Sequence, residues 1–353
     1  MTESSTQPMS STSLYEEIYD PIRPELAAVI ANISSLAEEH QGPLSGDGLH
    51  NKVMAERLEH VLSAPGKRLR PAITLLASRL WRNPSDLDVM MGTAVELLHI
   101  ATLIHDDTVD AADTRRGRET ASALWGRNVS VLLGDYVFAA AARFVCDTNS
   151  VRLVRRFAET IMELSRGELN ELLDGQDSHV TRDSYYQRIY DKTASLFTTA
   201  SESGAVLGGA PESDIKLLRN YGYKLGLAYQ VLDDVLDYDS TSEELGKPAG
   251  NDLKEGVLTL PAIMLIEVEP ESNAVFDWFK SARAAREAGH SEIDTVTLDT
   301  AIEAVRSSGF IEASRDIAQG LIDEARDSLS ELPETAEKAA LQTLADLTGG
   351  RRS

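Results

Sequence analysis

Two copies of the pattern Asp-Asp-x-x-Asp constrain this chain most, because each one ends a run of apolar residues with helical spacing. Their members are Asp106, Asp107, Asp110, Asp233, Asp234 and Asp237. Residues four apart share one face of an α-helix, so Asp106 should lie beside Asp110 and Asp233 beside Asp237. Like charges at that spacing weaken a helix by roughly a few tenths of a kcal/mol. Mg²⁺, which binds oxygen ligands and shares them with phosphates, would offset this repulsion.

Each motif could also be an ordinary solvated end of a helix, and for a single copy that reading is the better one, because short motifs often match by chance. Two copies, each after an apolar helix, favour two acidic helix ends that face each other and hold Mg²⁺ ions with a diphosphate between them. An EF-hand fits less well, because the loop that would begin at Asp237 lacks the glycine required at its sixth position.

The remaining sequence predicts an all-α bundle. Helical spacing runs from about Leu14 to the end of the chain, and Gly and Pro stand mainly between the helical segments. We expect loops at residues 41–50, 177–183 and 240–256, and no alternating run predicts a strand. The expected organisation is one domain over residues 14–353, with roughly a dozen helices, after a disordered Ser- and Thr-rich tail at residues 1–13.

Charge and cysteine content narrow the function. The 353 residues include 57 acidic and 34 basic side chains, for a formal net charge of −23. Such a surface argues against nucleic acid or an anionic membrane as the main partner. The single cysteine, Cys146, permits no disulfide within the chain and suits a reducing, cytoplasmic compartment. We find no secretory signal and no apolar run as long as a membrane span.

Cations cluster at a few places in this acidic chain. Lys67, Arg68 and Arg70 lie beside a helix expected to start at Pro71, and three arginines follow the first aspartate motif. Each cluster suits a phosphate, but a basic surface turn or local neutralisation of the aspartates explains it equally well. Lys192 stands in an apolar segment, where a buried ammonium needs an anionic partner.

These motifs, taken in order, resemble the trans-isoprenyl diphosphate synthases, or polyprenyl synthetases, from about Tyr15 to the C-terminus. The matching blocks are Gly66-Lys-Arg-Leu-Arg-Pro, Leu98-His-Ile-Ala-Thr-Leu-Ile-His-Asp-Asp-Thr-Val-Asp, Asp113-Thr-Arg-Arg-Gly, Gly134-Asp-Tyr, Lys192-Thr-Ala, Tyr229-Gln-Val-Leu-Asp-Asp-Val-Leu-Asp and Gly246-Lys-Pro with Asp252-Leu. The resemblance implies an isoprenoid synthase-type helical bundle around a central cavity, usually a homodimer, that uses Mg²⁺ to join isopentenyl diphosphate to an allylic diphosphate.

The resemblance also assigns roles to residues of this chain. It implies an isopentenyl diphosphate site at Lys67, Arg70, His99 and Arg116. It implies an allylic diphosphate site at Arg115, Lys192, Thr193, Gln230 and Lys247. It implies a metal centre at Asp106, Asp107, Asp110, Asp233, Asp234 and Asp237, of which all but Asp237 are expected, with Lys192, to act in catalysis. Val257 departs from the family, because many members have a lysine there for the allylic diphosphate.

The chemistry expected of such a site begins with ionisation of the allylic C–O bond. Mg²⁺ and the surrounding Lys and Arg side chains would stabilise the departing diphosphate in a site closed to water. The isopentenyl double bond then attacks the allylic cation, which the oxygens of Thr193 and Gln230 could stabilise. No side chain is an obvious base, so the diphosphate is expected to take the proton.

Product length is expected to depend on residues one to two helical turns before Asp106. Leu98, Ala101 and Thr102 stand there, and none is aromatic. Short-chain members of the family typically have a bulky aromatic at one of the last two positions, so this chain resembles the geranylgeranyl and longer synthases, most of all the long-chain ones. Phe157 is the expected floor of the tunnel. Alternatively, Ala101 serves only close helix packing.

Two related kinds of protein also fit part of this pattern. A class I terpene cyclase shares the first motif, although its second metal motif normally has a different composition. A non-catalytic subunit of a two-chain synthase usually lacks some of the aspartates, whereas this chain has all six. His99 could be an ordinary core histidine instead of a ligand-binding residue.

Overall fold

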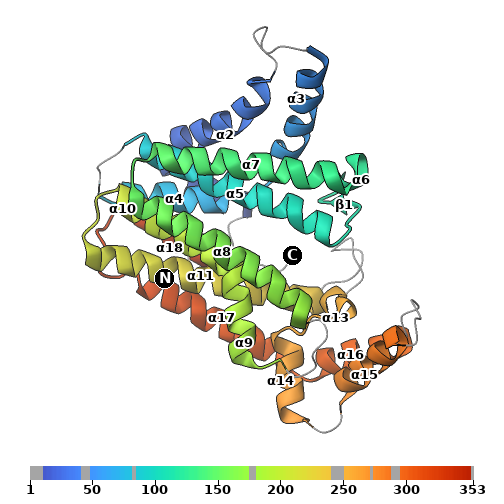
Figure 1. Cartoon of the computed structure of the whole chain (residues 1–353). Helices are drawn as coiled ribbons and strands as arrows, with labels where there is room; N and C mark the ends of the chain where they lie inside the picture. Colours follow the sequence, from blue (N-terminus) through green and yellow to red (C-terminus); the bar gives the residue numbers. More distant parts are fainter. Residues whose placement is uncertain are drawn as a thin grey trace. The chain divides into compact units, whose positions relative to one another are not determined.

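The computed structural model describes residues 11–40, 48–81, 85–174, 180–239, 250–270, 273–287 and 295–350. They form helices almost throughout, so the all-α prediction is confirmed (Figure 1). The first helical elements are α1 (Ser11–Tyr19), η1 (Asp20–Ile22), α2 (Arg23–Glu38), α3 (Gly48–Leu62), α4 (Leu69–Arg79), α5 (Leu87–Val109), α6 (Ala121–Trp125), α7 (Arg127–Asp147) and α8 (Val151–Asp174). The later ones are α9 (Arg182–Ile189), η2 (Tyr190–Ala194), α10 (Ser195–Leu207), α11 (Glu212–Asp239), α13 (Asn251–Glu255), α14 (Leu260–Val268), α15 (Ala274–Glu287), α16 (Thr295–Ser307), α17 (Phe310–Asp327) and α18 (Ala336–Gly349).

The expectation of no strands was wrong in one place. Strands β1 (Thr114–Arg115) and β2 (Arg118–Glu119) pair antiparallel, with Thr114 opposite Glu119 and Arg115 opposite Arg118. The turn residues Arg116 and Gly117 have φ angles of 51° and 75°. Positive φ at both central residues is the backbone of a type I′ hairpin turn. Strands of two residues are too short to give an alternating pattern, so periodicity could not predict them.

Five boundaries differ from the prediction. Helix α3 begins at Gly48, inside the loop expected at residues 41–50, and helix α9 begins at Arg182, inside the loop expected at residues 177–183. Helix α1 begins at Ser11, inside the expected tail, and helix α4 begins at Leu69 instead of Pro71. Helix α13 lies inside the loop expected at residues 240–256, between Gly250 and Gly256 with φ angles of 74° and 87°. Residues 240–249 lie outside the described residues. A five-residue helix bounded by left-handed glycines has too few turns to show helical periodicity.

The chain divides into two compact units, each formed by separate segments of the sequence. Unit 1 comprises Met1–Glu159, Thr199–Arg219 and Glu331–Thr343, and unit 2 comprises Thr160–Thr198, Asn220–Ser330 and Leu344–Ser353. We describe each unit by itself. The prediction of a single domain over residues 14–353 stays a prediction.

The core of unit 1 is built on close contact between helices. Most side chains of α5 between Met91 and Ile104 are buried. Helix α10 lies directly on α4, because a Cβ added at Gly204 or Gly208 would collide with the carbonyl oxygen of Thr74 or Ser78, respectively. Glycine is therefore required at both positions by packing.

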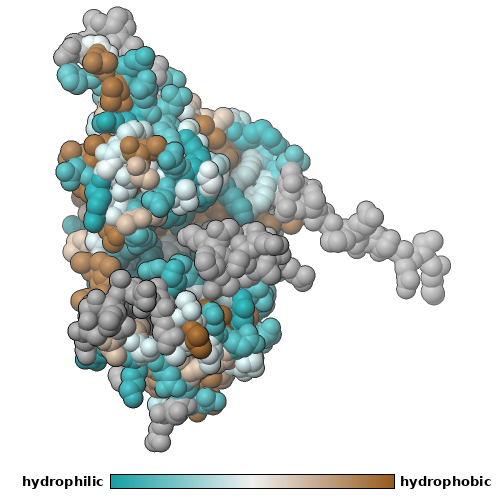
Figure 2. Space-filling view, turned by 90° about the vertical axis from the view of Figure 1, so that its right-hand side faces the viewer, coloured by the Kyte–Doolittle hydropathy of each residue, from teal (hydrophilic) through white to brown (hydrophobic). Residues whose placement is uncertain are grey.

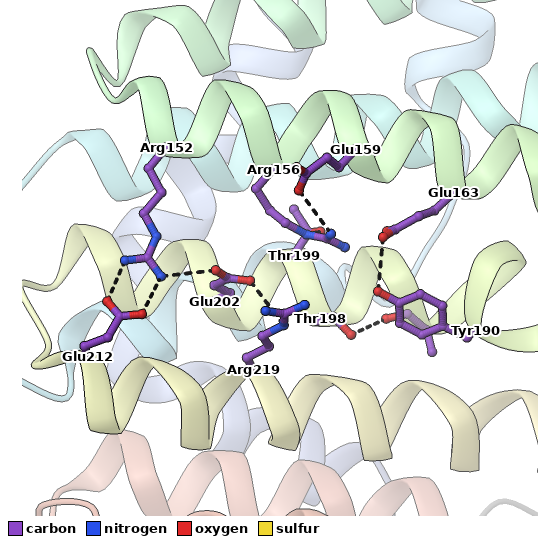
Figure 3. Close-up of polar contacts among 11 residues, drawn as sticks. Arg152, Arg156, Glu159, Glu163, Tyr190, Thr198, Thr199, Glu202, Glu212 and Arg219 are labelled. Atoms are coloured by element: carbon purple, nitrogen blue, oxygen red, sulfur yellow. Dashed lines mark hydrogen bonds and ion pairs between the residues drawn. The ribbon is translucent and has the colours of Figure 1, made fainter. Parts of the chain in front are cut away.

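Ion pairs join the starts of α8 and α11 to α10 in unit 1 (Figure 3). The guanidinium of Arg152 lies 2.7 Å from one oxygen of Glu212 and 3.3 Å from the carboxylate of Glu202. Glu202 is 7% exposed and also lies 3.7 Å from Arg219. A carboxylate so deeply buried requires such partners, so the network fixes these three helices together.

Helices α5 and α7 differ in how much apolar surface they bury. Both are long and apolar enough to span a membrane by length and composition, contrary to the expectation from the sequence. The most apolar window of α5 is 72% buried, as in the core helix of a folded protein, but that of α7 is only 44% buried. Val131 and Leu132 of α7 are exposed, and Figure 2 shows small hydrophobic groups among hydrophilic residues on one face.

Candidate active site

The first aspartate group lies at the C-terminal end of α5, in unit 1. The amide of Asp110 donates to the carbonyl of Asp106 at 2.8 Å, so these two residues lie one turn apart, as the spacing predicts. Asp106 is half-buried and Asp110 is exposed. Asp107 is 7% exposed and accepts a 2.5 Å bond from Arg115 on β1. The group therefore presents Asp106 and Asp110 toward solvent, while Asp107 holds the hairpin.

His105, immediately before this group, fixes the end of α5 against α7. Its Nε2 lies 3.3 Å from the carbonyl of Val131 and 3.4 Å from the carboxylate of Asp135. A Cβ added at Gly134 would collide with the imidazole ring. The glycine of the Gly134-Asp135-Tyr136 block thus makes room for His105, which in turn sets the position of Asp106.

The basic loop before α4 contains one structural cation. Arg68 has a φ of 50° and donates to Glu96 at 2.5 Å and to the carbonyl of Ala64 at 3.1 Å. Glu96 is 3% exposed, so this ion pair is largely withdrawn from solvent. Arg68 therefore shapes the loop, which leaves Lys67 and Arg70 as its candidates for binding an anion.

Two tyrosines of α1 contact Lys67. Its ammonium lies 5.5 Å from the ring centroid of Tyr15, within the range of a cation–π interaction. The hydroxyl of Tyr19 donates to the carbonyl of Lys67. Sequence reasoning missed both tyrosines, because nothing in the local pattern indicates a contact with a residue about fifty positions later.

Four arginines gather around His99, which is half-buried on α5. Burial first, and then the positive charges of Arg70, Arg116, Arg115 and Arg68, hold the pKa of His99 well below its usual value. The imidazole is therefore neutral at pH 7. Several cations beside one neutral imidazole suit a multiply charged anion, and the resemblance assigns such a ligand to Lys67, Arg70, His99 and Arg116.

Arg115 and Arg116, although adjacent, have different partners. Arg115 bonds to Asp107, whereas Arg116 donates to the carbonyl of Pro65. Nη1 of Arg116 would lie 3.1 Å from a Cβ added at Gly66, so this guanidinium lies against the basic loop. The hairpin thus directs one arginine to the aspartates and the other to the Lys67–Arg70 loop.

The second aspartate group belongs to α11 of unit 2, and its members differ in burial. Asp233 is exposed, whereas Asp234 is 4% exposed and accepts bonds from Tyr185 at 2.6 Å and Gln230 at 2.7 Å. Burial raises the pKa of Asp234 to about 7. The carboxylate of Asp237 accepts from the amides of α13, at 3.2 Å from Asn251 and 3.1 Å from Asp252.

Sequence reasoning missed Tyr185 and Asp252 as parts of this group. Tyr185 is fully buried and holds Asp234 from 49 positions earlier in the chain. The pKa of Asp252 is well above its usual value, because of burial first and then the charges of Asp237, Asp234 and other nearby carboxylates. Asp252 belongs to one of the matching sequence blocks, Gly246-Lys-Pro with Asp252-Leu, but the resemblance assigned it no role.

The Lys192-Thr193 pair lies in η2, a short π-helical segment of unit 2. The ammonium of Lys192 lies 2.5 Å from Glu171 and 3.2 Å from Glu168, which are the anionic partners that its half-buried position requires. The hydroxyl of Thr193 donates to the Gln230 side-chain oxygen at 2.6 Å. π-helical turns often occur at functional sites.

Two glycines allow η2 its position. A Cβ added at Gly167 of α8 would lie 2.7 Å from the amide nitrogen of Lys192, and one at Gly226 of α11 would lie 2.5 Å from Cα of Ala194. Both neighbours are backbone atoms, which cannot move aside as a flexible side chain can. The π-helical segment is therefore held between two helices at backbone distance.

The remaining predicted residues have the following positions. Lys247 lies outside the described residues, and Val257 is half-buried with its amide bonded to the carbonyl of Asp252 at 2.8 Å. Ala101 and Leu98 are 0% and 1% exposed, and Phe157 is 3% exposed. The half-buried Thr102 donates to the carbonyl of His99 at 2.8 Å.

The aspartate carboxylates fit a hard divalent cation whose coordination shell is completed by another ligand. Within the described ranges, no three His, Cys, Asp or Glu side chains lie close enough together to form a metal cage. Mg²⁺ usually takes one or two carboxylates and fills its other positions with water and substrate phosphates. Asp106, Asp110 and Asp233 suit that role, because they are carboxylates that solvent reaches.

The sequence model of the polyprenyl synthetase family matches residues 51–294. The chain is 33% identical to heptaprenyl diphosphate synthase component 2 of Geobacillus stearothermophilus, over 95% of this chain and 98% of the relative. It is 35% identical to octaprenyl diphosphate synthase of Escherichia coli (strain K12), over 82% of this chain and 87% of the relative.

Solved structures show the same similarity. A decaprenyl diphosphate synthase from Rhodobacter capsulatus is 35% identical, with a TM-score of 0.82 over 95% of this chain and 98% of that chain. A polyprenyl synthase from Caulobacter crescentus CB15, complexed with calcium and isoprenyl diphosphate, is 34% identical, with a TM-score of 0.83 over 98% of this chain and 100% of that chain.

Proposed function

The chain belongs to the polyprenyl synthetase family, and on this basis we propose that it condenses isopentenyl diphosphate with an allylic diphosphate. It is a prenyltransferase, and its product is an all-trans polyprenyl diphosphate of geranylgeranyl length or longer. The observation that carries the proposal is the similarity, at 33% to 35% identity over most of the chain, to heptaprenyl, octaprenyl and decaprenyl diphosphate synthases. The same similarity favours a long-chain product. It also favours a synthase over a terpene cyclase.

The expected cofactor is Mg²⁺. The carboxylates that would bind Mg²⁺ are those of Asp106 and Asp110 in unit 1 and of Asp233 in unit 2. Asp107, Asp234 and Asp237 would support these three residues. When bound, the metal neutralises charge on the diphosphate and so favours its departure. Calcium in the Caulobacter crescentus relative supports a divalent cation together with an isoprenyl diphosphate.

The side chains of this chain bind and orient the substrates. Lys67, Arg70, His99 and Arg116 bind isopentenyl diphosphate. His99 does so as a neutral donor, because burial first, and then the arginines around it, keep its pKa low. Arg115, Lys192, Thr193, Gln230 and Lys247 bind the allylic diphosphate. The bond from Thr193 leaves the Gln230 oxygen fixed in place, where its partial negative charge stabilises the allylic cation. The departing diphosphate accepts the proton.

A condensation assay on the purified chain tests the proposal. Radiolabelled isopentenyl diphosphate, farnesyl diphosphate and Mg²⁺ would be incubated with the enzyme, and the products separated by reversed-phase chromatography. We expect label in polyprenyl diphosphates of geranylgeranyl length or longer, and none when EDTA is present. Incorporation that is absent with every allylic starter, in a folded protein supplied with Mg²⁺, would contradict the proposal.

The proposed assembly is a homodimer in the cytoplasm. Helix α7 exposes Val131 and Leu132, and α8 exposes Met162 and Leu169, which are apolar surfaces that a second copy would cover. The exposed thiol of Cys146 suits a reducing compartment. Sedimentation equilibrium should give twice the chain mass of 38.5 kDa, and a monomer at micromolar concentration would contradict the dimer.

A second candidate is a two-component synthase. One relative is named component 2 of a heptaprenyl diphosphate synthase, and this chain covers 98% of it. In that case the chain would carry the catalytic aspartates and require a different protein for full activity. The condensation assay decides, because a homodimeric synthase is active as the purified chain and a component is not.

A further inference from the structure

The β1–β2 hairpin carries two of the predicted diphosphate ligands on a very small element. Each strand has two residues, and an isolated hairpin is at best marginally stable even when it is longer. The turn residue Arg116 has a φ of 51°, which a non-glycine residue keeps only when its surroundings hold it there. The hairpin therefore needs anchors outside its own ladder.

His60, near the end of α3, supplies two of these anchors. Its Nε2 lies 2.9 Å from the carbonyl oxygen of Glu119, and its Nδ1 lies 3.2 Å from the guanidinium of Arg118. A carbonyl only accepts and a guanidinium only donates, so Nε2 donates to Glu119 and Nδ1 accepts from Arg118. The ring of Trp125 meets the imidazole edge-on, with centroids 5.3 Å apart at 78°, and fixes its orientation.

The same short stretch of chain leads directly into the basic loop. Ser63 lies 3.4 Å from Arg118, and the carbonyl of Pro65 accepts from Arg116. Lys67 follows two residues later. The end of α3 and the residues that follow it thus connect two motifs about fifty residues apart in sequence, the hairpin and the basic loop.

We infer that His60 is a positioning residue for the isopentenyl diphosphate site. Through Glu119 and Arg118 it holds β2 and the turn, so that Arg116 stays against Pro65 and Gly66, the residues that lead to Lys67. Arg115 keeps its own ion pair with Asp107, so loss of His60 should disturb Arg116 far more than Arg115. The identity of the ligand rests on the proposed function.

The test compares three variants with the wild type. His60→Ala removes both bonds, His60→Gln keeps a donor at the position of Nε2, and His40→Ala is the control. His40 is another half-buried histidine of unit 1, which bonds to Tyr136 at 2.8 Å and lies outside the site. Steady-state KM for each substrate and kcat are measured, together with hydrogen exchange of the amides of residues 114–119.

We expect His60→Ala to raise KM for isopentenyl diphosphate by about tenfold, equal to about 1.4 kcal/mol, while kcat and the allylic KM change by less than about threefold. The hairpin amides should exchange faster in this variant alone. His60→Gln should restore most of both effects, and His40→Ala should resemble the wild type.

Three results would overturn the inference. They are an unchanged KM for isopentenyl diphosphate in His60→Ala, equal losses in both KM values and kcat, and a Gln variant as impaired as the Ala variant. If the wild type itself does not condense the substrates, the proposed function fails. The exchange rates of the hairpin, and calorimetric titration with inorganic diphosphate, then still decide whether His60 holds the hairpin and its anion site.

Discussion

Residues that are adjacent in the sequence of this site bond to different partners, and Arg115 and Arg116 are the clearest example. Arg115 pairs with the buried Asp107, whereas Arg116 adopts a left-handed backbone and reaches the carbonyl of Pro65. A single residue in the left-handed region is enough to send consecutive side chains toward different elements. Asp233 and Asp234 also differ although they are adjacent, because Asp234 is buried and Asp233 is exposed.

The arginine pair predicts a split between the two substrates. Arg116→Ala should raise KM mainly for isopentenyl diphosphate, and Arg115→Ala mainly for the allylic diphosphate, because each removes a charge-assisted contact worth about 1.5–3 kcal/mol from one site. Titration of each substrate against each variant measures the split. Equal losses for both substrates in both variants would show that the assignment of the two sites is wrong.

His99 predicts a particular dependence on pH. Its folded-state pKa is lowered by burial and by the arginines, so the native state binds fewer protons than the unfolded state near pH 6. The neutral ring therefore favours folding above the ordinary pKa of about 6.5, and this stability is lost as pH falls below it.

Long-range ¹H–¹⁵N spectra test this directly, with His99→Gln used to assign the signal. In the free protein His99 should remain neutral at pH 6, and inorganic diphosphate should raise its pKa, because an anion favours the imidazolium. Titration of the His99 ring near 6.5 in the free protein would contradict the arrangement of cations around it.

Backbone contacts between neighbouring helices determine which partners the side chains of each helix can reach. The π-helical segment η2 lies between Gly167 and Gly226, and it presents Lys192 to Glu171 and Thr193 to Gln230. An ordinary α-helical register would rotate these side chains relative to each other. Two glycines on neighbouring helices therefore determine how Lys192 and Thr193, the residues proposed to bind the allylic diphosphate, are arranged.

Gly167→Ala tests this packing. Its Cβ would lie 2.7 Å from the amide nitrogen of Lys192, so η2 must move, and we expect about 1–3 kcal/mol lower stability and a higher allylic KM. Gly320→Ala in α17 is the matched control, since nothing lies within 4 Å of the added methyl group and alanine is the better helix former. Urea unfolding and steady-state kinetics provide the measurements. A Gly167 variant as stable and active as the control would show that η2 does not depend on this contact.

Helix α5 carries the prediction on product length. Ala101 is fully buried before the aspartates, so Ala101→Phe should shorten the product and leave the first condensation intact. Phe157→Ala should lengthen the product. The variant keeps the neighbouring Arg156, which holds α8 to α10 through a 2.9 Å bond to Thr199. Thr102→Phe, at a half-buried position, serves if Ala101→Phe does not fold. Product chromatography gives the result, and an unchanged distribution in folded variants would place the tunnel elsewhere.

For the whole molecule, the sequence predicted the features that depend on local spacing. The helices, the aspartates one turn apart and the cations beside His99 follow from periodicity, charge and the order of the motifs. The inward position of Asp234, the hairpin and η2 did not follow, because each depends on a contact far away in sequence. Tyr185 holds Asp234, His60 holds β2, and Gly167 admits η2. No local pattern contains those partners.

The rate of the first condensation in Asp106→Ala and Asp233→Ala shows most directly whether both aspartate groups are catalytic. Asp239→Ala is the control outside both motifs. We expect both aspartate groups to be needed for ionisation of the allylic diphosphate, and they belong to different helices and different units. Single-turnover experiments with saturating Mg²⁺ should show each of the first two variants slowed on the order of a hundredfold or more, equal to about 3 kcal/mol or more of transition-state stabilisation, and the control unchanged. Turnover close to wild type in either motif variant would show that its aspartate group is not needed for the reaction.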